Sequence, residues 1–197
     1  QQAAQMSSRE LHIADFPCSL ASWMAAIPAA PGSLGWQAAV ASLLEAAAFK
    51  PGNVHPAAGF DDLQHDDFVA AAMAIAEPFN RLSQPRPRGC GDQPRSVGRV
   101  ILAAVEAAVA ATRSNANLGI VLAITPLAAA ATPLARGVAA VLSSLGRDDA
   151  VAIWQAIATA QPGGLGRVAQ HDLAGPPPDS ILEAMHLARQ VVLGHAA

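Results

Sequence analysis

The segment Lys50-Pro51-Gly52-Asn53-Val54-His55 combines a cation, an amide and an imidazole beside a Pro-Gly turn. Lys50 is the only lysine in the chain, and every other basic residue is an arginine. A lysine ammonium binds phosphate as a compact point charge, whereas arginine favours planar, two-point contacts. The segment therefore suits a phosphate ligand bound by Lys50, in a volume that Asn53 and His55 can also reach. The alternative is a helix C-terminus stabilised by a cation and ended by Pro-Gly.

A second polar cluster is acidic and runs from Asp61 to Asp67. Its carboxylates repel one another unless a cation lies among them. Few, hard oxygen ligands suit Mg²⁺, which keeps bound waters and shares phosphate oxygens. The four carboxylates between Asp61 and Asp67 thus suit a magnesium ion. The alternative is a solvated acidic helix N-terminus, favoured by the helix macrodipole.

The third cluster, Ser114-Asn115-Ala116-Asn117-Leu118-Gly119, comes directly before the most apolar segment of the chain. A buried helix N-terminus offers free N–H groups and a partial positive charge, which together bind phosphate. An asparagine there can cap the helix and can also bind a ribose or a base. The alternative is that Asn115 and Asn117 only cap the helix.

A weaker feature is the glycine-rich run around Gly163 and Gly164, which His171-Asp172 follows. It can form a flap that brings backbone close to a ligand, or simply a loop that ends a helix. It is not a dinucleotide-binding motif, because no strand precedes it and the spacing is wrong. The sequence also has no GxSxG, HExxH or Walker A motif.

Composition indicates the elements that must position these clusters. Of 197 residues, 52% are hydrophobic and 14% are charged, which excludes a disordered chain. Alanine is abundant and has the lowest helix cost, so we expect an all-α fold, a single globular multi-helix bundle with buried Ala-rich central helices. The net charge of -3 gives no basic surface for nucleic acid. An Ala-rich exterior is consistent with a homodimer.

Two cysteines far apart in the sequence form no CxxC or zinc motif, which favours a reducing compartment. The first ten residues lack the basic start and apolar core of a signal peptide. We therefore expect a cytoplasmic protein, organised as an N-terminal arm over residues 1–32 and a helical domain over residues 33–197.

Apolar periodicity and capping residues predict where the helices lie. A short helix fits 20–27. Ser33 caps a helix that ends at Phe49-Lys50, and a second helix runs from near Leu63 to about Ala76 and is disrupted near its end by Pro78. Ser96 caps a third helix that ends between Thr112 and Asn115. Two further helices are expected over 148–160 and from Ser180 to about Leu193.

The stretch from Ser114 to Ala135 has no charged residue and is long enough to cross a bilayer. It is rich in alanine rather than leucine, however, and its prolines at 126 and 133 would interrupt a membrane span. We therefore expect a buried helical hairpin, broken near Pro126 or Pro133, and no membrane partner.

Taken in order, these clusters resemble the triphosphoribosyl-dephospho-CoA synthase family, in particular a shorter, divergent branch found in archaea and some bacteria. The shared pattern is Glu45, the Lys50–Val54 segment, the acidic segment from Gly59 to Phe68, and Asn115-Ala116-Asn117-Leu118-Gly119. The resemblance extends from about Ser42 to about Arg189. In this chain, Ala116-Asn117-Leu118 replaces a His-Lys pair of the family motif.

The resemblance implies an all-α transferase that moves the triphosphoribosyl group of ATP to a ribose hydroxyl of dephospho-CoA and releases adenine. The product is the precursor of the prosthetic group of acyl-carrier subunits in citrate lyase and malonate decarboxylase. ATP and a dephospho-CoA-like acceptor are the implied partners, and Mg²⁺ is the implied cofactor.

The same resemblance implies roles for the residues of the clusters. Metal binding falls to Asp61, Asp62 and Asp66, and acid/base chemistry to His55 or His65, since histidine titrates near neutrality. Residues implied in binding nucleotide are Lys50, Gly52, Asn53, Asn115, Asn117, Gly119, Gly163 and Gly164. Two other functions stay open: a nucleotide-using enzyme of another cofactor pathway, such as a pterin pathway, and a catalytically silent helical module for binding or assembly.

Overall fold

The computed structural model describes residues 20–48, 54, 59–60, 63–83, 96–162 and 173–194, with side chains up to residue 189. Within these ranges the chain is all-α, as expected, and its only extended pairing is an isolated bridge between Phe60 and Leu63. The helices are α1 (Leu20–Ala26), α2 (Leu34–Ala47), α3 (His65–Ala74), α4 (Ala76–Ser83), α5 (Val97–Thr112), α6 (Leu118–Ala129), α7 (Leu134–Ser143), α8 (Arg147–Ala160) and α9 (Ile181–Gly194).

Local hydrogen bonds start the helices where the sequence predicts. The hydroxyl of Ser33 accepts from the backbone N–H of Trp36 at 3.2 Å and caps α2. Ser96 accepts in the same way from Arg99 at 3.1 Å and caps α5. Each cap satisfies one of the N–H groups that the first turn of a helix leaves unpaired.

The second predicted helix is two helices. It begins at His65 rather than near Leu63, and it breaks at Ile75 before continuing as α4. Pro78 is the third residue of α4. A proline has no N–H for the carbonyl four residues earlier, here that of Ala74, and its ring crowds that oxygen. The break therefore falls directly after Ala74, whose carbonyl receives no helical hydrogen bond from Pro78.

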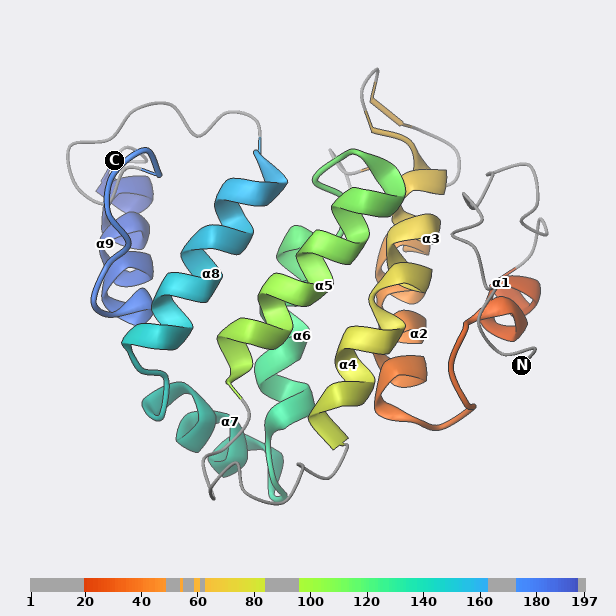
Figure 1. The fold of residues 1–197 in the computed structure, drawn as a ribbon, viewed down its shortest axis with the longest axis horizontal. Coiled ribbons are helices and arrows are strands. Elements are labelled where there is room, and N and C mark those ends of the chain that lie inside the picture. Colours follow the sequence, from red (N-terminus) through yellow and green to blue (C-terminus); the bar gives the residue numbers. More distant parts are fainter. Residues whose placement is uncertain are drawn as a thin grey trace, which may run out of the picture.

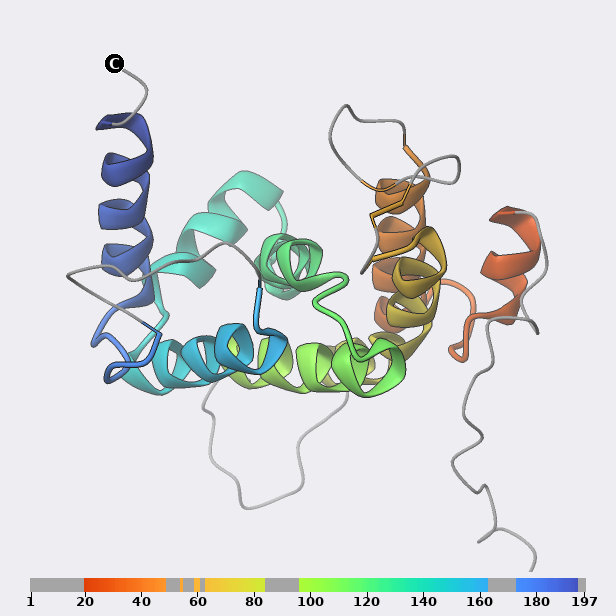
Figure 2. The same ribbon diagram turned by 90° about the horizontal axis from the view of Figure 1, so that it is seen from above.

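The core is built around α5, which contacts α3, α4, α6 and α8. Figures 1 and 2 show α5 and α8 running side by side, α6 behind α5, and α1 and α9 at opposite ends of the molecule. Small residues permit these close contacts. A Cβ added to Gly98 on α5 would lie 2.6 Å from both the Cα and the carbonyl oxygen of Asp149 on α8. Phe79, Ile101, Val105 and Ile153 fill the space around this crossing.

The α6–α7 pair differs from the buried hairpin expected above. Helix α6 continues through Pro126 as far as Ala129, and the break comes before Pro133, which precedes α7. Val121 and Thr125 are the buried residues of α6, and none of the described residues of α7 is buried. The expectation is thus wrong for α7 and holds for one face of α6. An apolar sequence is buried only where another element covers it, and here α5 covers one side.

None of the described helices is by itself long and apolar enough to cross a membrane. The α6–α7 pair meets the criteria of length and composition only when its two helices are taken together, and they are bent by 109°.

Candidate functional site

A cavity of about 570 Å³ opens between α2, α3 and the first turns of α6. Its volume is within the range of about 300–1,000 Å³ found for small-molecule sites. The residues that line it are Ala41, Glu45, Val54, Phe60, Leu63, Phe68, Asn115, Asn117, Leu118, Gly119, Ile120, Ala123, Ile124 and Pro162.

The walls of this cavity are largely apolar. Phe68 on α3 and Ile124 on α6 are half-buried parts of the core beneath it. Glu45 carries the only charge among the described lining residues, and it is an exposed side chain near the end of α2. The remaining polar side chains among the described lining residues are the amides of Asn115 and Asn117. An apolar cavity with few polar groups is typical of sites that orient a small ligand.

The loop between α5 and α6 positions these amides. Helix α5 ends at Thr112, and the next residue, Arg113, adopts a left-handed backbone conformation with φ 56°. The hydroxyl of Ser114 then accepts from the N–H of Ala116 at 3.3 Å and tightens the turn. Asn117 is left-handed as well, with φ 69°, and its carbonyl accepts from Val121 at 2.8 Å to begin α6. Asparagine is among the few residues other than glycine that adopt this conformation readily.

Asn117 is the most unusual polar residue of the wall. It is 2% exposed, and neither Oδ1 nor Nδ2 has a hydrogen-bond partner within the described part of the chain. Its side chain does not cap α6. Leaving a buried donor or acceptor unpaired costs about 1–3 kcal/mol. The fold therefore buries an unpaired donor and an unpaired acceptor at the start of α6.

The backbone at the start of α6 is also open to the cavity. Gly119, its second residue, is exposed, and a Cβ added there would meet no described atom within 4 Å. The N–H groups of a first helical turn have no partner inside the helix and carry a partial positive charge. This turn can thus donate hydrogen bonds to a ligand in the cavity.

The structure brings together four residues that the family resemblance connected. Glu45 lies on the same cavity as Asn115, Asn117 and Gly119, although α2 and α6 are far apart in the sequence. Other predicted site residues lie outside the described residues: Lys50, Gly52, Asn53, His55, Asp61, Asp62, Gly163 and Gly164.

His65 and Asp66 are described, and neither is among the described residues that line the cavity. His65 is buried at the start of α3, where its ring lies 5.2 Å from that of Trp23 on α1 at an interplanar angle of 40°. Asp66 is exposed in the first turn of α3. Over the described residues, no three His, Cys, Asp or Glu side chains are grouped closely enough to hold a metal. Of the three aspartates predicted to bind magnesium, only Asp66 is among the described residues.

The apolar part of the cavity was not predicted from the sequence. Phe60 is 51% exposed at the mouth of the cavity. A large aromatic residue in a polar loop beside Gly59 was a signal that could have indicated a ligand. Ala123 and Ile124 gave no such signal, because their apolar spacing is that of an ordinary core helix.

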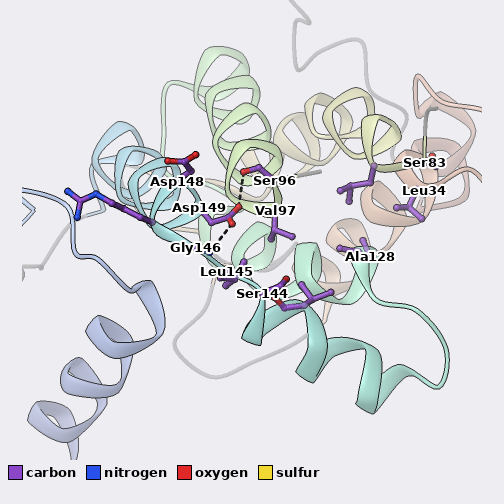
Figure 3. A pocket seen from close by; sticks show the side chains of 14 residues that line it. Leu34, Ser83, Ser96, Val97, Ala128, Ser144, Leu145, Gly146, Asp148 and Asp149 are labelled. Atoms are coloured by element: carbon purple, nitrogen blue, oxygen red, sulfur yellow. Dashed lines mark hydrogen bonds between the residues drawn. The ribbon is translucent and has the colours of Figure 1, made fainter. Parts of the chain in front are cut away.

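A second cavity, of about 550 Å³, lies among the starts of α2, α5 and α8 and the ends of α4, α6 and α7. Figure 3 shows Asp149 reaching toward Ser96 within it. The Asp149 carboxylate accepts from the Ser96 hydroxyl at 2.7 Å, from the N–H of Gly98 at 2.8 Å and from the N–H of Gly146 at 3.2 Å. These hydrogen bonds hold the start of α5 against the start of α8. Both oxygens of the Asp149 carboxylate are therefore paired within the protein.

A family model described as CitG, ATP:dephospho-CoA triphosphoribosyl transferase, matches residues 31–193, a range that contains the whole of the first cavity. No curated protein and no solved structure matches the chain.

Proposed function

Because the chain belongs to the ATP:dephospho-CoA triphosphoribosyl transferase family, we propose that it transfers the triphosphoribosyl group of ATP to dephospho-CoA and releases adenine. A ribose hydroxyl of the acceptor forms the new bond to the anomeric carbon of ATP as the glycosidic bond to adenine breaks. The hydroxyl proton goes to a base, and the departing adenine takes up a proton. The product would serve as the precursor of a prosthetic group.

The observation that carries this proposal is the convergence of Glu45 with Asn115, Asn117 and Gly119 on one cavity. These residues belong to two separate segments of the family pattern. A reaction between two large substrates depends above all on holding them in the right geometry. The cavity supplies an apolar surface, two amides and the open turn of α6 for that purpose.

Glu45 is the residue on the described wall with the chemistry of a proton acceptor. A carboxylate within reach of the attacking hydroxyl can take its proton as the bond to the anomeric carbon forms. We assign this role to Glu45 alongside His55, since His65 lies against Trp23 and not on the cavity wall.

We further propose that Lys50 and a magnesium ion bind the phosphates of ATP. Lys50 neutralises part of the triphosphate charge, and Asp61, Asp62 and Asp66 are the candidates for holding Mg²⁺. When bound, the metal would neutralise further charge on the phosphate oxygens. We expect EDTA to abolish activity and added Mg²⁺ to restore it. Full activity in the presence of EDTA would show that the reaction does not need magnesium.

Adenine release from ATP in the presence of dephospho-CoA tests the function. We expect wild-type protein to release adenine only when both substrates are present. Glu45→Gln should lower kcat about 100-fold, within the range for loss of a general base. Lys50→Ala should lower kcat/KM and retain a cooperative melt. Glu106→Gln, an exposed change on α5 outside both cavities, is the matched control and should leave the rate unchanged.

A protein that binds neither nucleotide would contradict the proposal. Binding is measured as the rise in melting temperature with added ATP or dephospho-CoA, because a ligand that binds only the folded state stabilises it. The absence of a shift with either ligand, with or without Mg²⁺, would favour the silent helical module.

A further inference from the structure

We propose that the ring of Phe60 stacks on the adenine base of a substrate at the mouth of the cavity between α2, α3 and α6. The inference rests on the proposed function, which supplies two ligands that contain adenine, ATP and dephospho-CoA. It gives a binding role to a side chain that the proposed reaction leaves unused.

The two aromatic residues among the described lining of this cavity, Phe60 and Phe68, differ in burial. Phe68 is half-buried in the core beneath the cavity, whereas Phe60 is 51% exposed at its mouth. Leaving half of a phenyl side chain in water costs free energy, because apolar area is more stable when it is removed from water. A ligand that covers the Phe60 ring would remove that cost.

Hydrogen bonds fix the backbone of Phe60 at this mouth. Its N–H donates to the carbonyl of Leu63 at 2.9 Å, and its carbonyl accepts from the N–H of Leu63 at 3.4 Å. The same carbonyl accepts from the side-chain amide of Gln64. The N–H of Gln64 donates to the Asp67 carboxylate at 2.8 Å, in the first turn of α3. Phe60 is thereby tied to the helix that carries Phe68, so a ligand that binds against it loses little entropy in ordering the loop.

A nucleobase is the substrate group that best suits this ring. Each base has a flat π-face on which an aromatic side chain can stack. The other long apolar group of the two substrates is the pantetheine arm of dephospho-CoA, a flexible chain that has no flat ring. The mostly apolar wall beside Phe60, which includes Leu63 and Ile124, would keep water from a base in contact with the ring.

The inference is compatible with phosphates at the first turn of α6. The N–H groups of that turn have no partner inside the helix and carry a partial positive charge. Leu118 and Gly119 line the same cavity as Phe60. One nucleotide can therefore place its base against the ring and its phosphates toward the turn.

The deciding variant is Phe60→Ala, which removes the ring. The hydrogen bonds of Phe60 are made by its backbone, so the change keeps the contacts that hold the loop to α3. Phe60→Trp is the rescue variant, because it restores an aromatic face. Leu134→Ala is the matched control, since Leu134 on α7 is a similarly exposed apolar residue, at 53%, and is not among the described lining residues of either cavity.

The experiment measures dissociation constants by calorimetry for two pairs of ligands. ATP is paired with inorganic triphosphate, and dephospho-CoA with 4′-phosphopantetheine, so that the second member of each pair lacks the adenine base. We expect Phe60→Ala to weaken the binding of ATP, of dephospho-CoA or of both about tenfold, within the range for loss of one aromatic ring stacked on a base. Phe60→Trp and Leu134→Ala should bind both ligands as the wild type does. The two base-free ligands should bind all variants equally.

The two pairs distinguish the source of the base. Weaker binding of ATP assigns the stacked adenine to the substrate that gives up its triphosphoribosyl group, and weaker binding of dephospho-CoA assigns it to the acceptor. Unchanged affinity of Phe60→Ala for both substrates overturns the inference. An equal loss for a substrate and its base-free partner overturns it as well, because the ring would then contact phosphate or the pantetheine arm. Binding needs no turnover, so a wild type that binds ATP but releases no adenine contradicts only the proposed reaction.

Discussion

The two cavities have nearly equal volumes, about 570 and 550 Å³, but they differ in the state of their polar groups. In the second cavity, Asp149 accepts three hydrogen bonds from the protein itself. In the cavity at the start of α6, Asn117 is more deeply buried and has no partner among the described residues. Cavity volume therefore does not distinguish the two regions, whereas the pairing of their polar groups does.

A pair of glycines shows the same contrast in the backbone. Gly98 is the second residue of α5 and Gly119 the second residue of α6. A Cβ on Gly98 would collide with the backbone of Asp149, whereas one on Gly119 would reach no described atom within 4 Å. One helix start is closed by packing, and the other is open to a ligand.

Gly98→Ala is the change with the largest expected effect on folding. Because the added Cβ meets backbone at 2.6 Å, α5 and α8 must move apart, and we expect a loss of about 3 kcal/mol in the free energy of unfolding. Denaturant unfolding measures it. A loss below about 1 kcal/mol would mean that the two helices separate easily and would weaken the contrast between the two cavities.

Asp149→Ala should lower the free energy of unfolding by about 2 kcal/mol, because it removes a helix cap and leaves the Gly98 N–H without its acceptor. We expect the affinity for ATP to stay unchanged in the folded fraction, as measured by calorimetry. A weakened affinity for ATP with an intact fold would instead place a ligand in the second cavity.

Asn117→Gly should act in the opposite direction on stability. It removes an unpaired buried amide and keeps the left-handed backbone, so we expect the free energy of unfolding to rise by about 1 kcal/mol. Adenine release should fall in the same variant. Loss of stability here would show that the amide has partners inside the folded protein.

Gly119→Ala should raise the free energy of unfolding by about 0.8 kcal/mol, since alanine is the better helix former and the added methyl group meets no described atom. The same methyl group occupies space in the cavity, so nucleotide affinity should fall several-fold. Thermal melts with and without ATP separate the two effects. An unchanged melting shift with ATP would place the ligand away from this turn.

The smallest effect is expected outside both cavities, at the ion pair between Glu77 and Arg81 on α4, which is 2.8 Å long and more than half exposed. Glu77→Gln should cost about 0.4 kcal/mol. Glu77 raises the pKa of Arg81 above its usual value through a hydrogen bond and its charge. While the Glu77 carboxylate is ionised, the contribution is therefore complete below the ordinary arginine pKa and is lost in strong alkali as Arg81 loses its proton. A larger cost, measured by denaturant unfolding, would contradict the view that stability resides in the helix crossings.

The sequence predicted the helices well where the cause is local. Ser33 and Ser96 cap α2 and α5 through bonds to residues three positions on, and such bonds depend on little beyond the neighbouring sequence. The split at Ile75 has a local cause in Pro78, and the sequence predicted the disruption near this point. The family resemblance likewise rested on short segments that can be recognised one at a time.

What the sequence alone determined is thus the all-α class, most helix starts and ends, and the residue types available for chemistry. Tertiary structure decided that α7 has no buried residue, that His65 lies against Trp23, and that Glu45 and Asn117 share one cavity. Capping and helix propensity act within a few residues, so the local sequence contains their cause. Burial and convergence depend on which distant helices pack together, and a segment of the chain does not specify its neighbours by itself.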